Sequence, residues 1–295
     1  MNTKTAMITI AGRPNVGKST LTNYLVGEKI AIVSNKPQTT RNRICGIVTR
    51  EETQFVFVDT PGYHRSRTKL GDYMVNVARE SIADVDATIL VVEPVANVGG
   101  QEEDLIAKIK ASRSPAILAI NKIDTVEKEE LLAVIAAYSQ YADFDAIIPI
   151  SAKTGDGVEA LLDVCEKFAQ EGPFLFPDDM TTDQPERQVM AEIIREKLLW
   201  TLDKEIPHGT AVEITKFSER DSGIIDIDAT IYCEKASHKG IIIGKQGAML
   251  KRISSMARAD CEKFMGTKVF LTTWVKVKEN WRDSDFLVRN FGYSE

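Results

Sequence analysis

The stretch that decides the fold of this 295-residue chain reads Gly12-Arg13-Pro14-Asn15-Val16-Gly17-Lys18-Ser19-Thr20. An apolar run over residues 6–11 precedes it, and residues 21–26 follow it with helical spacing. Strand, glycine-rich loop and helix in this order are the context that a phosphate-binding loop requires. The two glycines let backbone N–H groups face phosphates, and the start of the helix adds its positive dipole end. The sequence therefore predicts an anion site built largely from backbone.

Two side chains extend this site toward a nucleotide. Lys18 can reach the β- and γ-phosphates, and the Ser19 hydroxyl can hold Mg²⁺. Gly62, farther along the chain, can bring a backbone N–H close to the γ-phosphate. The residues predicted to bind the nucleotide phosphates are Gly12, Asn15, Val16, Gly17, Lys18, Ser19, Thr20 and Gly62.

Composition points to a globular protein of two domains. Hydrophobic residues make up 43% of the chain and charged residues 27%, and the length suits two cores of ordinary size. The four cysteines are widely spaced, which favours reduced thiols in a cytoplasmic protein. The net charge is −6, but residues 235–282 hold 11 basic and only 3 acidic side chains. Such a local excess suggests that the second half faces a polyanion.

Apolar, β-rich runs alternate with helical segments from residue 5 to about residue 170. This alternation predicts a mostly parallel sheet with helices on both faces, an α/β fold in which ligands bind beyond the carboxyl ends of the strands. The expected strands are 5–11, 44–50, 53–58, 86–92, 115–120 and 145–150, and the expected helices lie near 19–27, 70–83, 101–111, 127–141 and 157–169.

A second magnesium ligand, an acidic residue, is expected directly after the third of these strands. Residues 54–58 lead into Asp59-Thr60-Pro61-Gly62. An acid at a strand end beside a phosphate-binding loop can support Mg²⁺, directly or through water. Gly62 can also act as the hinge of the loop that follows.

Two further strand ends carry groups suited to guanine. Residues 116–120 lead into Asn121-Lys122-Ile123-Asp124, and residues 147–150 lead into Ser151-Ala152-Lys153. The Asp124 carboxylate can accept from both the ring N–H and the exocyclic amine of guanine, whereas adenine would leave it unpaired. Asn121 can brace the loops, the Lys122 stem can cover the base, and the Ala152 N–H can meet the guanine O6. The predicted guanine-binding residues are Asn121, Lys122, Asp124, Ser151, Ala152 and Lys153.

These four motifs, in this order, resemble the translation-factor-related class of P-loop GTPases. The resemblance implies a first switch in the polar segment 37–43, where a threonine joins Mg²⁺ when the γ-phosphate is present. Thr40 is preferred because it precedes an arginine, and Thr39 remains the competitor. The implied magnesium ligands are Ser19, Thr40 and Asp59. The implied switch residues are Thr39, Thr40, Asp59, Thr60, Pro61, Gly62 and Tyr63, with a second switch over residues 63–70.

One residue departs from many small GTPases of this class. They place a glutamine after the glycine of the D-x-x-G motif to orient the attacking water, but here the residue is Tyr63. Slow intrinsic hydrolysis is therefore expected. Asn15 matches relatives that use a bound K⁺ in place of an arginine finger, although it can also simply brace the loop.

The second half begins after a linker rich in proline, glycine and acids. Composition assigns residues 1–170 to the first domain, 171–184 to the linker and 185–295 to the second domain. The expected elements of the second domain are a helix to about residue 204, strands at 210–217 and 224–233, two helices ending near residue 265, a strand at 268–278 and a closing helix at 281–290.

The loop Gly244-Lys245-Gln246-Gly247 between the two central helices carries the second functional signal. With this element order it resembles an α+β type II KH domain. The resemblance implies that the backbone of single-stranded RNA lies on the glycines, with Lys245 on a phosphate and residues 241–243 as the apolar floor of the groove. The predicted RNA-binding residues are Ile241, Ile242, Ile243, Gly244, Lys245, Gln246, Gly247 and Lys251.

One GTPase domain followed by this KH domain resembles the Era family of bacterial ribosome-assembly GTPases over nearly the whole chain. Residues 192–197, Glu-Ile-Ile-Arg-Glu-Lys, and residues 274–278, Trp-Val-Lys-Val-Lys, also look like that family. The resemblance implies GTP hydrolysis and binding near the 3′ end of 16S ribosomal RNA during assembly of the small subunit, by a cytoplasmic monomer. The alternative is a GTP-regulated protein or membrane-surface adaptor whose basic domain binds no specific RNA, with peripheral contact at the inner face of the cell membrane.

Overall fold

The computed structural model describes residues 3–62, 68–82 and 85–293. These residues fall into two compact units. The described part of the first unit comprises residues 3–31, 40–62, 74–82 and 85–183. The second comprises residues 32–39, 68–73 and 184–293, so two short segments of the first half of the sequence group with the second half.

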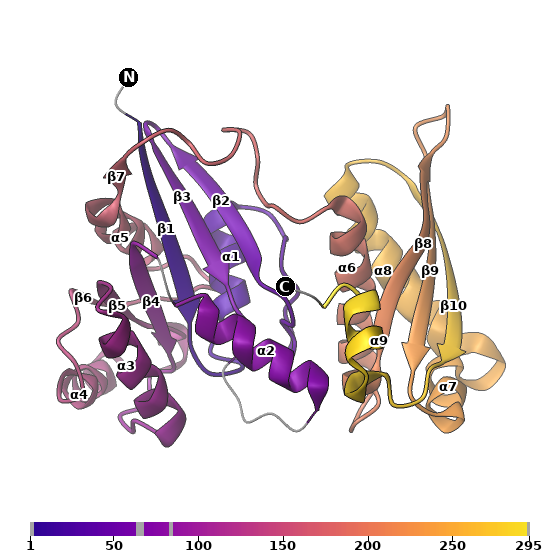
Figure 1. Ribbon diagram of the computed structural model, residues 1–295, viewed down its shortest axis with the longest axis horizontal. Helices are drawn as coiled ribbons and strands as arrows, with labels where there is room; N and C mark the ends of the chain where they lie inside the picture. Colours follow the sequence, from indigo (N-terminus) through magenta and orange to yellow (C-terminus); the bar gives the residue numbers. More distant parts are fainter. Residues whose placement is uncertain (1–2, 63–67, 83–84, 294–295) are drawn as a thin grey trace. The chain divides into compact units, whose positions relative to one another are not determined.

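The first unit has the α/β architecture that the alternating sequence predicts (Figure 1). Among the described residues its sheet has seven strands in the order β2-β3-β1-β4-β5-β6, with β7 paired to β1. Strands β3, β1, β4, β5 and β6 run parallel, and β2 and β7 are antiparallel to their neighbours. The strands are β1 Lys4–Ala11, β2 Ile44–Arg50, β3 Thr53–Asp59, β4 Ala87–Val92, β5 Ala116–Ile120, β6 Ala146–Pro149 and β7 Gln170–Glu171. The helices are α1 Lys18–Val26, α2 Lys69–Glu80, α3 Gly100–Ser112, α4 Lys128–Ser139 and α5 Val158–Cys165, with 3₁₀ turns at Ile123–Thr125 and Glu166–Phe168.

Helices cover both faces of this sheet because its central strands are apolar on both sides. Alternate strand residues pack with α1 and α5 on one face, and the others pack with α3 and α4 on the opposite face. In β5 all five residues of Ala-Ile-Leu-Ala-Ile are buried. Continuous apolar runs of this kind are typical of strands whose two faces are both covered by helices. In sheets covered in this way, ligands bind beyond the carboxyl ends of the strands.

The segment that composition assigns to a linker lies against the first unit. β7 pairs with β1, and Thr182 forms a bridge with Gly46. The side-chain oxygen of the buried Gln54 accepts from the N–H groups of Leu175 and Phe176 at 2.9 and 3.0 Å. These backbone contacts extend the first unit to residue 183. They are long-range pairings, which local composition does not reveal.

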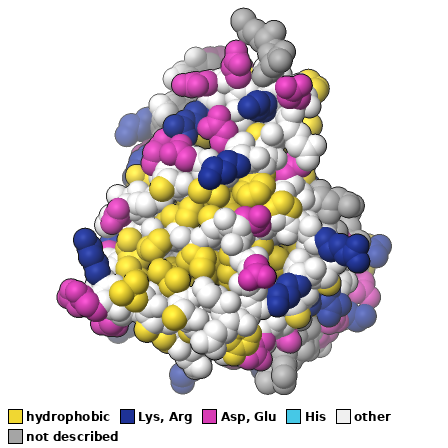
Figure 2. Space-filling view, turned by 90° about the vertical axis from the view of Figure 1, so that its left-hand side faces the viewer, with side chains coloured by type: hydrophobic (Ala, Val, Ile, Leu, Met, Phe, Trp, Pro, Cys, Tyr) yellow, Lys and Arg dark blue, Asp and Glu magenta, His cyan; other side chains and the backbone are white. Residues whose placement is uncertain are grey.

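Strand β6 forms one edge of the sheet. All four of its residues are half-buried, and Leu132 of the neighbouring α4 is 70% exposed. Hydrophobic side chains gather on the side of the first unit that carries α4 and β6 (Figure 2). The strand is short and ends at Pro149, which has no N–H, and both features limit pairing with a further strand.

The second unit contains a three-stranded sheet in the order β10-β9-β8. β9 is parallel to β10 and antiparallel to β8. The buried residues of α6 and α8 form one core with a single face of this sheet, joined by α7 through Ile242. The elements are α6 Glu186–Thr201, β8 Ala211–Glu219, β9 Ile225–Cys233, α7 Ala236–Ile243, α8 Ala248–Met265, β10 Val269–Val277 and α9 Asp285–Asn290, with 3₁₀ turns at Pro207–Gly209, Lys245–Gly247 and Trp281–Asp283.

The C-terminal segment is fixed to the same unit by aromatic packing. Trp281 is fully buried and its Nε1 donates to the carbonyl of Gly209 at 2.9 Å. Its ring lies 5.2 Å from that of Phe291 in an edge-to-face arrangement. The expected closing helix is therefore a 3₁₀ turn followed by the short α9. Within the described ranges, no helix combines the length and apolar character needed to cross a bilayer.

Candidate functional site

The phosphate-binding loop joins the end of β1 to the start of α1. Gly17 caps α1 with φ 101°, and a Cβ on it would lie 2.2 Å from the Asn121 side-chain nitrogen. Only glycine therefore fits this position. The Lys18 ammonium is buried and donates to the carbonyls of Gly12 and Arg13 at 3.1 and 2.9 Å. Burial lowers the pKa of Lys18 to about 8, although the Asp59 carboxylate opposes this shift.

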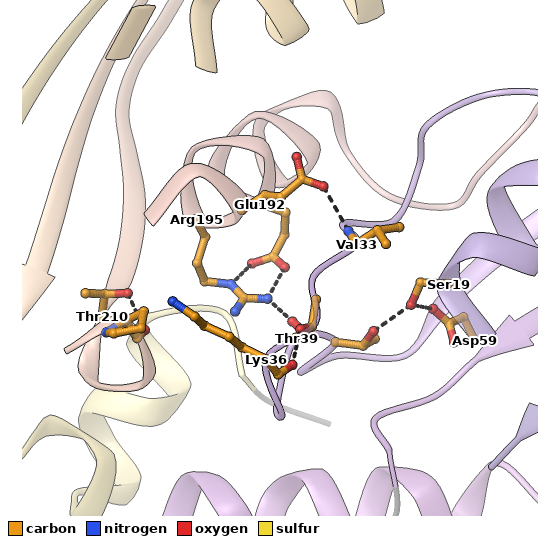
Figure 3. Close-up of polar contacts among 11 residues, drawn as sticks. Ser19, Val33, Lys36, Thr39, Asp59, Glu192, Arg195 and Thr210 are labelled. Carbon is orange, nitrogen blue, oxygen red and sulfur yellow. Dashed lines mark hydrogen bonds and ion pairs between the residues drawn. The ribbon is translucent and has the colours of Figure 1, made fainter. Parts of the chain in front are cut away.

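Ser19, Thr40 and Asp59 come together at the start of α1, as the sequence predicts for a magnesium site. Ser19 Oγ donates to Asp59 Oδ2 at 2.6 Å and lies 2.8 Å from Thr40 Oγ1 (Figure 3). Asp59 is fully buried and its Oδ1 has no hydrogen-bond partner. Burial raises the pKa of Asp59 to about 6, against the opposing effects of Lys18, the Ser19 hydroxyl and the Thr60 N–H. One orphaned carboxylate oxygen beside two hydroxyls is a set of hard oxygen ligands that fits Mg²⁺.

Asn121 connects three strand ends within the first unit. Its Nδ2 donates to the Val16 carbonyl at 2.8 Å, and its Oδ1 accepts from the Ala152 N–H at 2.9 Å. Asn121 therefore braces the phosphate-binding loop against the loop after β6, as the sequence suggests. The Ala152 N–H serves this brace in the structure, so a guanine O6 would share or replace Asn121 as its acceptor.

Asp124 and Lys122, two of the other predicted guanine-binding residues, make separate polar contacts. Asp124 Oδ1 accepts from the hydroxyl of the buried Ser151 at 2.7 Å. Lys122 has φ 65°, and its ammonium donates to the Asn15 carbonyl at 2.8 Å and to Glu93 at 2.5 Å. The Lys122 side chain thus bridges the β5 loop to the phosphate-binding loop. The Ser151 hydroxyl therefore fixes one oxygen of the Asp124 carboxylate.

The structure separates the two threonines of the first switch. The Thr40 hydroxyl lies beside Ser19, whereas the Thr39 hydroxyl donates to the Lys36 carbonyl at 2.6 Å. Within the second switch, residues 63–67 lie outside the described residues, so the expectations for Tyr63 and for most of this segment remain predictions.

The Gly-Lys-Gln-Gly loop lies between α7 and α8, where the KH resemblance places it. Gly244 has φ 73°, and a Cβ on it would lie 2.6 Å from that of Met249. Gln246 has φ 50°, and Gly247 caps α8 with φ 79°. Three residues of positive φ in four give a tight turn between the helices. An RNA backbone can approach its glycines closely.

The predicted RNA floor needs one correction. Ile242 is fully buried in the core of the second unit, so its side chain cannot contact RNA. Residues 241–243 belong to a helix, in which successive side chains point in different directions. Ile241 is 50% exposed and is the one of the three that presents a large apolar surface.

Sequence reasoning missed exposed aromatic side chains on the neighbouring strand. Phe270 and Trp274 are 57% and 59% exposed, and both lie on the face of β10 turned away from the helices. Because the side chains of a strand point alternately to its two faces, the sequence of residues 269–275 places Phe270 and Trp274 on one face, and this was the signal that could have found them. Exposed rings of this kind can stack on unpaired bases.

Sequence reasoning also missed polar contacts between α6 and residues 33–39, all within the second unit. Arg195, Glu196 and Trp200 take part in them. In the sequence, residues 192–197 show only a family likeness. No local pattern joins it to a loop more than 150 positions earlier.

The first unit combines a phosphate-binding loop, an acid after β3 and paired loops after β5 and β6, and a KH unit follows it in the chain. Together these features define a P-loop GTPase with an RNA-binding module. Family models agree, because the model described as 50S ribosome-binding GTPase matches residues 7–122 and that of the KH domain matches residues 205–282.

Similarity to relatives extends over nearly the whole chain. GTPase Era of Ruminiclostridium cellulolyticum is 53% identical over 293 residues, covering 99% of this chain and 98% of its own length. GTPase Era of Clostridioides difficile is 50% identical over 294 residues, covering 99% of each. The chain belongs to the Era family of GTPases, and it binds and hydrolyses GTP.

Solved structures of this family share the fold. A crystal structure of Era in complex with MgGDPNP and nucleotides 1506-1542 of 16S ribosomal RNA has a TM-score of 0.95 at 36% identity. A variant of Aquifex aeolicus Era bound to GDP.AlF4- has a TM-score of 0.94 at 36% identity. Each alignment covers 99% of this chain and 100% of the solved one.

Proposed function

We propose that this GTPase is a cytoplasmic switch that binds the 3′ end region of 16S ribosomal RNA and assists assembly of the small ribosomal subunit. The observation that carries the proposal is full-length likeness, in fold and sequence, to an Era chain solved with MgGDPNP and that RNA. The basic stretch 235–282 and the exposed Ile241 beside the glycine loop support an RNA partner over an uncharged one.

In this proposal the nucleotide lies across the strand ends of the first unit. Residues 12–20 and Gly62 surround the phosphates, and Asn121, Lys122, Asp124 and residues 151–153 hold the guanine. Ser19, Thr40 and Asp59 hold Mg²⁺, which screens the charge of the phosphates during hydrolysis. The choice of Thr40 rests on its hydroxyl, which lies 2.8 Å from that of Ser19 while the Thr39 hydroxyl is bonded to Lys36.

Asp124→Asn tests the guanine assignment. We expect the variant to lose selectivity for GTP and to favour xanthosine triphosphate, because an amide cannot accept from both guanine donors. Lys18→Ala, which removes the buried ammonium, should abolish tight binding of either nucleotide. Fluorescent-nucleotide titrations measure both effects, and an Asp124 variant that still selects GTP would overturn the assignment.

A potassium ion beside Asn15 is the finer part of this proposal. Asn15 has φ 67° and its carbonyl accepts from Lys122, so its side chain stands in a loop of fixed shape. Hydrolysis should be faster in KCl than in NaCl, and Asn15→Ala should remove the difference. Equal rates in both salts would leave Asn15 as a brace of the loop.

Binding of 16S rRNA 3′-end oligonucleotides, with GTP, GDP and no nucleotide, tests the RNA partner. A scrambled oligonucleotide and anionic lipid vesicles serve as competitors. Lys245→Asp/Gln246→Asp should abolish binding while keeping the loop, because aspartate tolerates the left-handed conformation at position 246. Binding to vesicles without selective RNA binding would favour the membrane-surface adaptor instead.

A further inference from the structure

Glu93 lies directly after strand β4 and belongs to none of the four nucleotide-binding motifs. Its Oε1 accepts from the Lys122 ammonium at 2.5 Å, and its Oε2 lies 3.7 Å from Nη2 of Arg13. All three residues belong to the first unit, and their side chains are between 34% and 36% exposed. Because β4 and β5 are parallel neighbours, Glu93 and Lys122 follow strands that end at the same edge of the sheet.

Lys122 is the principal partner of Glu93. The 2.5 Å contact is a charge-assisted hydrogen bond, whereas 3.7 Å is too long for a hydrogen bond. Arg13 also has a closer partner, because its Nε pairs with Oε1 of Glu102, whose carboxylate lies in a residue only 2% exposed. The contact of Glu93 with Arg13 is therefore secondary.

Two acceptors hold the Lys122 ammonium. Besides Glu93, it donates to the Asn15 carbonyl in the phosphate-binding loop at 2.8 Å. The backbone of Lys122 has φ 65°, a left-handed conformation that a lysine adopts only where its surroundings require it. The aliphatic stem is therefore fixed at both ends, by the backbone on one side and by the two acceptors on the other. A lysine side chain otherwise keeps more rotamer freedom than most.

The charge of Glu93 is unfavourable for a nucleotide. Its contacts reach Arg13 of the phosphate-binding loop, and like charges repel, so a carboxylate here opposes the binding of a polyphosphate. On charge alone, removing Glu93 would tighten the binding of GTP and GDP. Ordering of the Lys122 stem acts in the opposite direction, so the sign of the effect distinguishes the two roles.

We propose that Glu93 is a positioning residue for the guanine site: by holding the Lys122 ammonium, it keeps the Lys122 stem where the stem covers the base. The inference rests on the proposed function, because it takes Lys122 as a guanine-binding residue. A stem that is already ordered lowers the entropic cost of binding. GTP and GDP carry the same base, so both gain equally.

The test measures the affinities and dissociation rates of fluorescent GTP and GDP analogues in Glu93→Ala and Glu93→Gln. We expect Glu93→Ala to weaken both nucleotides by roughly three- to tenfold, the range for ordering one long side chain on binding. The ratio of GTP to GDP affinity and kcat at saturating GTP should stay unchanged. Glu93→Gln should recover part of the loss, because its amide oxygen can still accept from Lys122. Glu130→Ala is the matched control, since Glu130 is an exposed glutamate on α4.

A double-mutant cycle shows whether Glu93 acts through Lys122. Lys122→Met keeps an apolar stem and removes the ammonium, so it should weaken binding at least as much as Glu93→Ala. Glu93→Ala/Lys122→Met should then bind no more weakly than Lys122→Met alone. Additive losses would overturn the proposal. So would a loss that disappears in an Arg13→Met background, because it would assign the effect of Glu93 to Arg13.

Lys122→Ala separates failure of this inference from failure of the proposed function. It removes the stem itself, so it should weaken both nucleotides more than Lys122→Met does. If Lys122→Ala leaves both affinities unchanged, the guanine assignment of Lys122 fails. If Lys122→Ala weakens binding but Glu93→Ala, folded by circular dichroism, keeps or exceeds the parental affinity, the positioning role is overturned and the guanine assignment stands.

Discussion

Gly17 occupies a position where a single methyl group would collide with the Asn121 side chain. The added Cβ would lie 2.2 Å from the Asn121 amide nitrogen, which itself donates to the Val16 carbonyl. We expect Gly17→Ala to displace Asn121 and to weaken GTP binding by at least roughly tenfold, as measured by equilibrium titration.

Gly27 provides the matched control for this effect. It also has a positive φ, 77°, but nothing lies within 4 Å of an added Cβ. Gly27→Ala should cost only the backbone strain of about 1 kcal/mol and leave GTP affinity unchanged. Equal losses of affinity in both variants would mean that backbone strain, and not the collision with Asn121, is responsible.

The four cysteines should be unreactive in the folded protein. All are buried, and burial raises the pKa of Cys45 and of Cys165 to about 12. Since the thiolate is the reactive form, alkylation at about pH 8 should proceed only as fast as the protein opens. Mass spectrometry with iodoacetamide, with and without urea, measures this. Rapid labelling in the absence of urea would contradict the burial of these thiols.

Neighbouring residues of α7 should show opposite defects. Ile242 is buried in the core, so Ile242→Ala should lower the free energy of unfolding by about 2–5 kcal/mol. Ile241 is half-exposed, so Ile241→Ala should barely change stability but should weaken RNA binding. Urea unfolding and oligonucleotide titration of both variants separate these effects, and equal stability of the two would contradict this division of roles.

A charge cluster between α6 and α8 predicts a large loss of stability when its buried lysine is replaced. Lys197 is almost fully buried and contacts Glu196 at 2.7 Å and Asp260 at 2.5 Å. Lys197→Met removes the cation and leaves the buried Glu196 carboxylate without it, which should cost about 3–5 kcal/mol. Asp260→Asn, at a partly exposed partner, should cost less than about 1 kcal/mol. Urea unfolding compares the two, and similar costs would count against the burial argument.

The sequence predicts most elements of this protein because their signals are local. Strand β5 reads as an apolar run that ends in a polar loop, and the glycine loops carry their own backbone requirements. Other contacts join segments that are far apart in the chain, and the periodicity of the sequence cannot detect them. They are the contacts of residues 171–183 with β1 and Gln54, and those of residues 32–39 with α6. The three isoleucines at 241–243 form no single floor, because successive side chains of a helix point in different directions.

Two separate hydrophobic cores predict two unfolding transitions for the intact chain. One core lies around the seven-stranded sheet and the other around α6 and α8. GDP with Mg²⁺ should stabilise mainly the first unit. At a GDP concentration of roughly one hundred times the dissociation constant, the free energy of unfolding of this unit should rise by about 2.7 kcal/mol. Calorimetry of the parent and of Lys18→Ala tests this. A single transition that nucleotide shifts as a whole would show that the units unfold together.

The grouping of residues 32–39 with α6 has a consequence for anyone who divides this protein into fragments. A cut after residue 183 leaves the segment on the piece that has lost its helix. The carbonyl of Thr39 and the N–H of Val33 then face water, while the other piece exposes the charged side chains of Arg195 and Glu196. Nucleotide kinetics measured on the first fragment would then describe a chain in which residues 32–39 lack their partners on α6, and RNA affinities measured on the second fragment would describe a unit that lacks this segment.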